Sequence, residues 1–268
     1  MLFVSGLGQG QSLYPHHAYA WTQDVTFRRT YSDVCLCELP GVSGTPLRRG
    51  CTYPTAKESV EAVERFAATV LALPSLDCVT HSAGAFLLSY AARYSPCLFD
   101  KQVFAEGPAV FFTHFSKSWP HLFGEFDLRA LWRTVKACDA NALLNWLVMS
   151  EIHHQFALKN TTWFMECCHR EGPDTLGSNA MVLLGTEDAY VDGPATAKYL
   201  ARYHPAVRVH LSEGWAHGAF WDPANLETTM AQLRAFLCTD CDENQQPAKA
   251  AAVKASPQSV RAAFLRRA

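Results

Sequence analysis

The sequence predicts an α/β protein with a mostly parallel sheet and helices on both of its faces. Six short, continuously apolar segments predict strands, and segments with helical spacing lie between most of them. Continuous apolar runs are typical of strands buried on both faces, and strands that alternate with helices are typical of parallel sheets. The 268 residues suffice for one large domain of this kind.

The predicted strands are each too short and too apolar to form a half-exposed antiparallel edge. They are residues 2–4, 34–39, 78–80, 102–105, 181–184 and 207–211.

Helix start and stop signals separate these strands. Thr55 and Glu58 have the spacing of a capping box, and apolar residues follow on one helical face until Pro74 ends the segment. A helix-forming stretch, residues 85–94, follows the third strand. Pro194 opens a helix that runs to Tyr203, and Pro223 opens another that runs to Phe236.

The alternation stops between residues 111 and 170, where amphipathic helical patterns follow each other without a strand. We interpret this segment as an inserted helical cap. Its aromatic side chains either line an apolar substrate pocket or pack the cap onto the sheet, and packing is favoured for any single ring. They are Trp119, Phe123, Phe126, Trp132, Trp146, Phe156, Trp163 and Phe164. The domain is expected to span residues 1–238, and the polar and Ala/Lys-rich residues 239–268 to form a disordered tail.

Composition limits the classes of partner. The formal net charge of -2 offers no overall attraction for nucleic acid or anionic membranes, so a small neutral or apolar substrate is favoured. No apolar run reaches the roughly 20 residues of a transmembrane helix. Ten cysteines occur without a secretory pattern at the start, which favours the cytoplasm. Cys238 and Cys241 have metal-ligand spacing but lack a second pair, so no metal or other cofactor is predicted.

Three side chains predict the chemistry. Ser82 lies where the strand at residues 78–80 turns sharply into a helix. Asp188 follows the strand at 181–184, and His217 follows the strand at 207–211 in a loop flanked by Gly214 and Gly218. Carboxyl ends of parallel strands meet at one sheet edge, where open α/β sheets bind ligands. A serine hydroxyl needs a nearby base, and that base needs a third group to orient it.

Serine, acid and histidine in this chain order, each after a strand, resemble the α/β-hydrolase superfamily over most of residues 1–238. The resemblance implies Ser82 as nucleophile, Asp188 as acid and His217 as general base. It also implies an oxyanion hole built from the backbone amides of Leu7, in the loop after the first strand, and Ala83.

The sequence departs from the family pattern at three places. Thr80 stands where the motif usually has glycine, and Ser5 replaces the usual histidine of the oxyanion loop. The chain also begins on the strand that resembles the family's third strand. We therefore expect either a sheet trimmed at its edge or an incomplete start.

Other assignments of these residues stay open. Ser82 is also a good helix N-cap, and Asp192 or Glu106 can replace Asp188 as the acid. We expect a structural role for His81, because neighbouring side chains leave a turn in different directions. Gly6, Gly8 and Gly10 suggest a dinucleotide-binding loop, but Gln11 stands where that fingerprint needs glycine or alanine, and the acidic residue that should close the second strand is missing.

The sequence thus predicts a serine-dependent hydrolase of carboxylic esters or related acyl bonds, lipase-like or esterase-like, with a partly apolar small-molecule substrate. The alternative is a non-catalytic receptor or ligand-binding protein on the same fold. The oligomeric state is not predicted.

Overall fold

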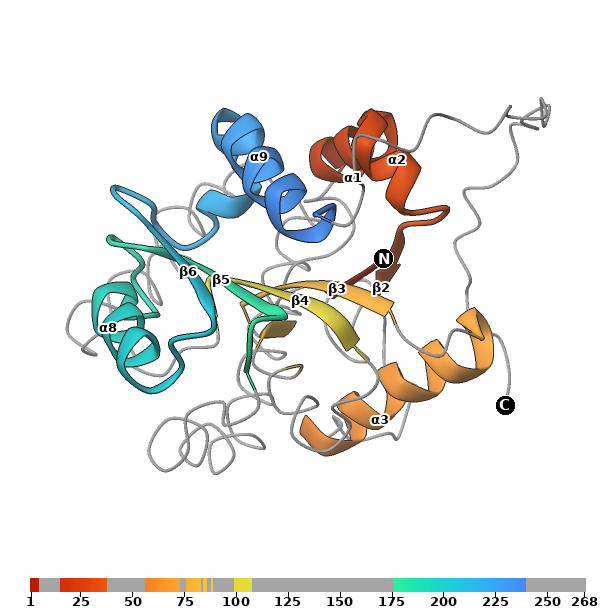
Figure 1. The fold of residues 1–268 in the computed structure, drawn as a ribbon, viewed down its shortest axis with the longest axis horizontal. Helices are drawn as coiled ribbons and strands as arrows, with labels where there is room; N and C mark the ends of the chain where they lie inside the picture. Colours follow the sequence, from red (N-terminus) through yellow and green to blue (C-terminus); the bar gives the residue numbers. More distant parts are fainter. Residues whose placement is uncertain are drawn as a thin grey trace, which may run out of the picture.

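Six parallel strands form the central sheet of this protein (Figure 1). The computed structural model describes residues 1–4, 15–37, 56–72, 76–82, 84–85, 88, 99–107 and 176–239. The strands are β1 (Leu2–Val4), β2 (Cys35–Cys37), β3 (Leu76–His81), β4 (Phe99–Ala105), β5 (Ala180–Gly185) and β6 (Arg208–Ser212). Their order across the sheet is β2-β1-β3-β4-β5-β6, and every pairing is parallel. The parallel sheet predicted from the sequence is therefore confirmed.

Alternate residues of strands β1 to β5 enter two separate cores, because successive side chains of a strand point to opposite faces. Leu2 and Val4 pack in one core and Phe3 in the other. Likewise Cys78 lies on the first face and Val79 on the second. All six β5 residues are buried, so the continuous apolar pattern of this strand correctly predicts burial on both faces.

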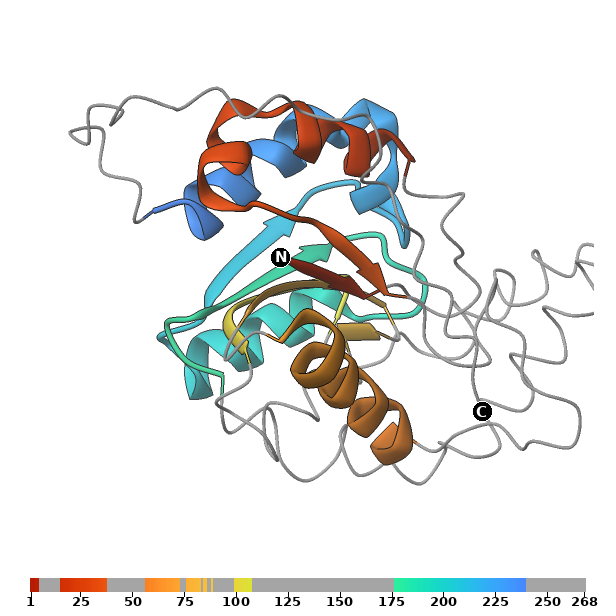
Figure 2. The ribbon, with the colours of Figure 1, turned by 90° about the vertical axis from the view of Figure 1, so that its right-hand side faces the viewer.

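Helices cover both faces (Figures 1 and 2). One layer contains α1 (Pro15–Gln23), α2 (Val25–Thr30) and α9 (Leu226–Leu237), and the other contains α3 (Ala56–Phe66) and α8 (Gly193–Tyr203). The first layer contributes Trp21, Phe27 and Leu233 to its core. The second contributes Val60, Val63 and Leu200 to the other.

The helix signals at Pro194 and Pro223 act where the sequence places them, whereas Thr55 of the predicted capping box lies outside the described residues. The Asp192 carboxylate caps α8 by accepting from the Ala195 amide at 2.9 Å, and Pro194 lies in the first turn. Pro223 opens a short 3-10 turn, η4 (Pro223–Asn225), from which α9 continues. After α3 the chain makes a π-helical turn, η2 (Ala67–Leu71), that ends at Ala72 with a positive φ of 53°, two residues before Pro74.

Two predictions differ from the structure. Helices α1 and α2 were not predicted, because exposed apolar residues such as Tyr19 and Val25 obscure a one-sided pattern around the buried Trp21 and Phe27. Strand β6 is parallel as expected but not buried, because it lies at the edge of the sheet and Leu211 is 42% exposed.

The predicted cap at 111–170 lies outside the described residues, as does the predicted tail apart from Thr239. Among the helices that the structure does describe, none has the length and apolar character needed to cross a membrane.

The loops after β5 and β6 lie in direct contact, and Gly185 is the point of closest approach. A Cβ added at Gly185 would lie 2.0 Å from the Trp215 carbonyl oxygen. The Glu187 amide donates to that same oxygen at 3.0 Å. A second hydrogen bond joins the Gly214 amide to Thr186 Oγ1 at 2.9 Å. Any side chain at residue 185 must therefore push the two loops apart.

We expect Gly185→Ala to lower the free energy of unfolding by about 1–3 kcal/mol, the usual cost of overpacking, and to displace the backbone at Trp215. Urea unfolding measures the first effect and a crystal structure of the variant the second. Gly177→Ala is the control, because its Cβ would lie 3.5 Å from Asn179 Oδ1, an ordinary contact. Equal stability of the two variants would contradict the close approach.

Candidate active site

Ser82 occupies the sharp turn that the sequence predicts after β3. Its φ is 49°, a left-handed conformation that is costly for a residue with a Cβ. Its amide donates to the Ala105 carbonyl at 3.0 Å, so pairing with β4 continues to the turn itself. Gly84, Ala85 and Leu88 are already helical. The half-buried serine therefore stands at a strand-to-helix junction under backbone strain.

His217 lies in the loop after β6, and its ring contacts Ser82. The distance from His217 Nε2 to Ser82 Oγ is 3.0 Å, and the side chain is 17% exposed. The Tyr190 ring packs edge-on against the imidazole, with centroids 4.8 Å apart. The next residue, Gly218, has a φ of 92°, which glycine adopts without the cost of a Cβ. Glycine at 218 therefore lets the chain turn away directly after the imidazole.

Asp188 approaches the other nitrogen of the same ring. Asp188 Oδ2 lies 2.9 Å from His217 Nδ1, and its side chain is 1% exposed. Oδ1 accepts from the amides of Tyr190 and Val191 at 2.8 and 2.9 Å. A carboxylate only accepts hydrogen bonds, so Nδ1 carries the proton and donates it to Oδ2. Nε2 then accepts from the Ser82 hydroxyl.

The structure also places the two alternative acids. Asp192 is occupied as the N-cap of α8. Glu106 Oε2 lies 3.8 Å from His217 Nδ1, too far for a hydrogen bond. Of the three carboxylates considered from the sequence, Asp188 is the one that hydrogen-bonds the imidazole.

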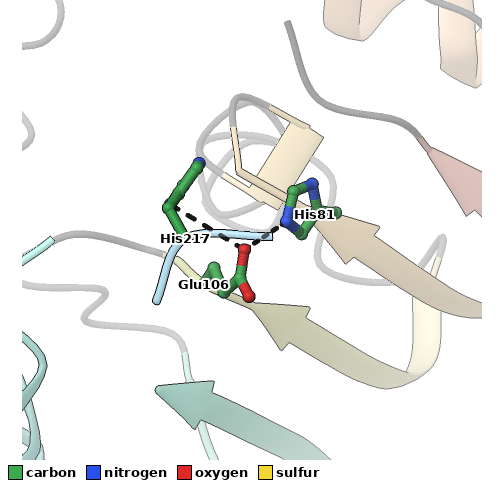
Figure 3. Close-up of side chains that lie close together, drawn as sticks. All are labelled: His81, Glu106 and His217. Carbon is green, nitrogen blue, oxygen red and sulfur yellow. Dashed lines mark hydrogen bonds and ion pairs between the residues drawn. The ribbon is translucent and has the colours of Figure 1, made fainter. Parts of the chain in front are cut away.

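Glu106 instead forms a buried cluster with His81 (Figure 3). His81 Nε2 and Glu106 Oε2 are 2.5 Å apart, and the two side chains are 0% and 1% exposed. His81 ends β3 and Glu106 directly follows β4, the neighbouring strand. This pair was not predicted from the sequence. The signal was present, because polar residues at the ends of two adjacent strands are brought together by a parallel sheet.

Burial and hydrogen bonding determine the charges of the pair. Burial lowers the pKa of His81 below its ordinary value, so the ring is neutral and donates Nε2–H. For Glu106, burial alone raises the pKa, but the contacts with His81, His217 and the Phe220 amide outweigh it and lower the pKa to about 2. Glu106 is therefore an anion inside the protein.

Thr80 shows how the departure from the usual glycine is accommodated. Its side chain is buried, and Oγ1 donates to the Val103 carbonyl of β4 at 2.9 Å. The hydroxyl is thus satisfied within the sheet. The predicted oxyanion donors, Leu7 and Ala83, lie outside the described residues, as does Ser5.

Residues able to ligate a metal meet at one place in the described part of the chain. Ligand atoms of His81, Glu106 and His217 lie within 4.8 Å of one another (Figure 3). Both Glu106 oxygens, however, already accept hydrogen bonds from backbone amides and His81. A cation would have to displace these donors from a buried site. Cys238 is buried at the end of α9, and Cys241 lies outside the described residues.

The charged Glu106 predicts acid sensitivity. Its pKa is about 2 when folded against an ordinary value of 4.5, so its stabilising effect is complete above pH 4.5 and is lost as the pH falls toward 2. We expect it to contribute about 3 kcal/mol, an order-of-magnitude value from the pKa difference. Neutral His81 adds a loss of stability in the same direction below pH 6.5, because its folded pKa is also lowered.

Urea unfolding at pH 7, 5, 4 and 3 tests this expectation in the wild type and in Glu106→Gln, which does not titrate at residue 106. The stability difference between the two proteins is expected to narrow between pH 4.5 and 3. A difference that stays constant over this range would show that Glu106 is not an ionised group with a lowered pKa.

No protein-family model matches the chain, and no curated protein matches it significantly. Solved structures do match. An epoxide hydrolase of Bacillus megaterium aligns with a TM-score of 0.61 and 18% identity over 88% of this chain and 93% of its own. A structure from work on carboxylesterases of the thaumarchaeon Nitrososphaera gargenis aligns with a TM-score of 0.58 and 12% identity over 89% of this chain and 90% of its own. The monoacylglycerol lipase of Paleococcus ferrophilus aligns with a TM-score of 0.53 and 15% identity over 88% of this chain and 93% of its own.

These proteins act on different bonds according to their names, so their likeness to this chain concerns the fold and leaves the reaction open. In the described part of the chain, the parallel sheet with helices on both faces agrees with that likeness. The resemblance recognised in the sequence is confirmed at this level, and the chain has the α/β-hydrolase fold.

Proposed function

We propose that this protein is a serine hydrolase of carboxylic esters or related acyl bonds, with Ser82 as nucleophile, His217 as base and Asp188 as acid. One observation carries the proposal. The His217 ring is hydrogen-bonded at both nitrogens, to Ser82 Oγ at 3.0 Å and to Asp188 Oδ2 at 2.9 Å. This arrangement of nucleophile, base and orienting acid is the one that acyl transfer needs.

In the first half of the proposed reaction, Ser82 Oγ attacks the carbonyl carbon and its proton passes to His217 Nε2. Asp188 stabilises the imidazolium that forms and keeps the proton at Nδ1. The tetrahedral intermediate then collapses, and the leaving alcohol takes the proton from Nε2. The product of this half is an ester of the Ser82 hydroxyl.

In the second half, His217 Nε2 removes a proton from water, and the resulting hydroxide attacks the acyl carbon. Collapse returns the proton to Ser82 Oγ and releases the carboxylic acid. We assign the oxyanion contacts to the backbone amides of Leu7 and Ala83, by resemblance to the superfamily. Each such donor typically contributes a few kcal/mol to lowering the barrier.

The substrate we propose is a small molecule with an apolar acyl or alcohol portion, bound with help from the predicted aromatic cap at residues 111–170. A near-neutral chain with a formal net charge of -2 gives no reason to expect a strongly charged substrate. We also propose that residues 1–238 form the domain, that residues 239–268 form a disordered tail and that the protein is located in the cytoplasm.

Fluorophosphonate labelling tests the nucleophile. We expect a covalent adduct on Ser82 in the wild type, no adduct in Ser82→Ala, and labelling slower by at least about 10³-fold in His217→Ala, because the hydroxyl then lacks its base. Intact-mass spectrometry and peptide mapping measure the adduct.

Ser212→Ala is the matched control, because Ser212 ends another strand of the same sheet, β6, and has no role in the proposed mechanism. It is expected to label like the wild type. Folded wild-type protein that binds a ligand but remains unlabelled would favour the receptor alternative and contradict the proposal.

A series of p-nitrophenyl esters tests the substrate class. We expect kcat/KM to rise with acyl chain length, because each buried methylene adds about 0.8 kcal/mol of apolar transfer energy. Ser82→Ala supplies the background rate. Negligible rates across the whole series would argue against an ester substrate, and high rates for acetyl esters alone would argue against an apolar acyl site.

A further inference from the structure

We propose that Glu106 is a positioning residue of this site: it holds the loop that carries His217 against the strand end that carries Ser82. It also places a second negative charge beside the imidazole. The inference rests on the proposed function, which assigns His217 as the base. Glu106 does not touch the reacting hydroxyl, and we assign it no proton transfer.

Glu106 attaches the loop that carries His217. Glu106 Oε2 accepts from the Gly218 amide at 2.5 Å, and Oε1 accepts from the Phe220 amide at 3.0 Å. The two oxygens of one carboxylate thus bind two backbone amides within the three residues that follow His217. Phe220 is itself fully buried. Two-point attachment restrains both the position and the rotation of this stretch of backbone.

Glu106 also links this loop to the segment that carries the nucleophile. Glu106 Oε2 also accepts from His81 Nε2 at 2.5 Å, and His81 is the residue before Ser82 (Figure 3). The His81 ring lies 5.5 Å from the His217 ring and 5.4 Å from the Trp221 ring, centroid to centroid. One carboxylate therefore joins the strand end before the nucleophile to the loop of the base. These segments are about 135 residues apart in sequence, as the Ser82–His217 separation shows.

The charge of Glu106 also acts on the His217 ring. His217 Nδ1 faces two carboxylates, Asp188 Oδ2 at 2.9 Å and Glu106 Oε2 at 3.8 Å. Among the residues that the structure describes, the Ser82 hydroxyl, neutral His81 and the Tyr190 ring also contact this ring. Because Glu106 is anionic and buried, its field is little screened by solvent. It therefore favours the imidazolium that forms during the reaction, in addition to Asp188.

Backbone strain supports the same assignment. Glu106 has a φ of 53°, a left-handed conformation that persists only where surrounding contacts determine it. Its amide donates to the Leu183 carbonyl of β5 at 2.8 Å. The residue is thus held between neighbouring strands, with its carboxylate directed toward the loop after β6.

Glu106→Gln is the first test. The amide keeps the size of the side chain but removes the charge and one acceptor oxygen. Its NH₂ group, itself a donor, must then face one of the donors that bind the carboxylate in the wild type. We expect kcat for a p-nitrophenyl ester to fall about 10- to 100-fold with KM nearly unchanged, because a small misplacement of a catalytic group costs this much. The acid limb of the kcat/KM profile should also move to lower pH, because one of the two anions beside His217 is gone.

Glu106→Asp is the second variant, and it keeps the charge while shortening the reach by one methylene. We expect a loss of kcat of at least about 5-fold, because the shorter carboxylate cannot reach Gly218, Phe220 and His81 together, with the acid limb close to that of the wild type. All rates are normalised to the folded fraction, so this variant remains informative if Glu106→Gln folds poorly.

Asp24→Asn is the matched control. The Asp24 carboxylate also accepts from two backbone amides, those of Thr26 and Phe27, and pairs with Arg234, but it does so between α2 and α9. We expect lower stability with unchanged kcat and an unchanged pH profile. A purely structural role of Glu106 would make its variants behave in the same way.

The outcomes separate the inference from the proposed function. If wild-type protein neither labels at Ser82 nor hydrolyses esters, the proposed function fails. If the wild type is active while Glu106→Gln or Glu106→Asp keeps wild-type kcat per folded molecule, or the acid limb of Glu106→Gln does not move, the positioning role is overturned.

Discussion

The position of the loop after β6 is the constraint on which the rest of the site depends. This loop carries His217 and begins where the pairing of β6 with β5 ends, at Ser212. Contacts with neighbouring segments hold it beyond that point. The Trp215 carbonyl accepts from Glu187, and the amides of Gly218 and Phe220 donate to Glu106. These hydrogen bonds lie on either side of the imidazole, so both of its nitrogens find partners at the same time.

A buried anion that holds a loop has a large desolvation free energy, because removal of a carboxylate from water is unfavourable. At Glu106 this cost is offset by three hydrogen-bond donors, two backbone amides and His81. The same donors would be left unpaired if the carboxylate were replaced by an apolar side chain. The arrangement therefore specifies one position of the loop more strictly than apolar packing of the same volume does, since each donor must face a particular oxygen.

Strain is concentrated at the carboxyl ends of the central strands. Ser82 and Glu106 both have positive φ values, and each directly follows a strand in the middle of the sheet. Backbone hydrogen bonds to the adjacent strands hold them there, from Ser82 to Ala105 and from Glu106 to Leu183. The rigid sheet thus maintains two unfavourable conformations where polar side chains must leave it at a sharp angle.

The sequence by itself determined the main architecture and the three residues that meet. Continuous apolar segments separated by helix signals predicted the parallel sheet, and the positions of Ser82, Asp188 and His217 after strands predicted that they share one edge. These are local patterns, and local patterns report strand ends and helix starts directly. Side-chain periodicity failed for α1 and α2, where Tyr19 and Val25 are exposed. In β6 the alternation of Val209 and Leu211 with Arg208 and His210 is typical of a half-exposed strand, and it was not recognised.

Only the tertiary structure decided which carboxylate bonds the histidine. Three carboxylates stand in suitable places along the chain. Loop packing places Asp188 at 2.9 Å from His217 Nδ1, makes Asp192 a helix cap and leaves Glu106 as a charge 3.8 Å away. The His81–Glu106 pair was not predicted, although each residue stands at or directly after the end of a strand. The order of strands places β3 beside β4, and the loop after β6 meets Glu106 only through contacts in space.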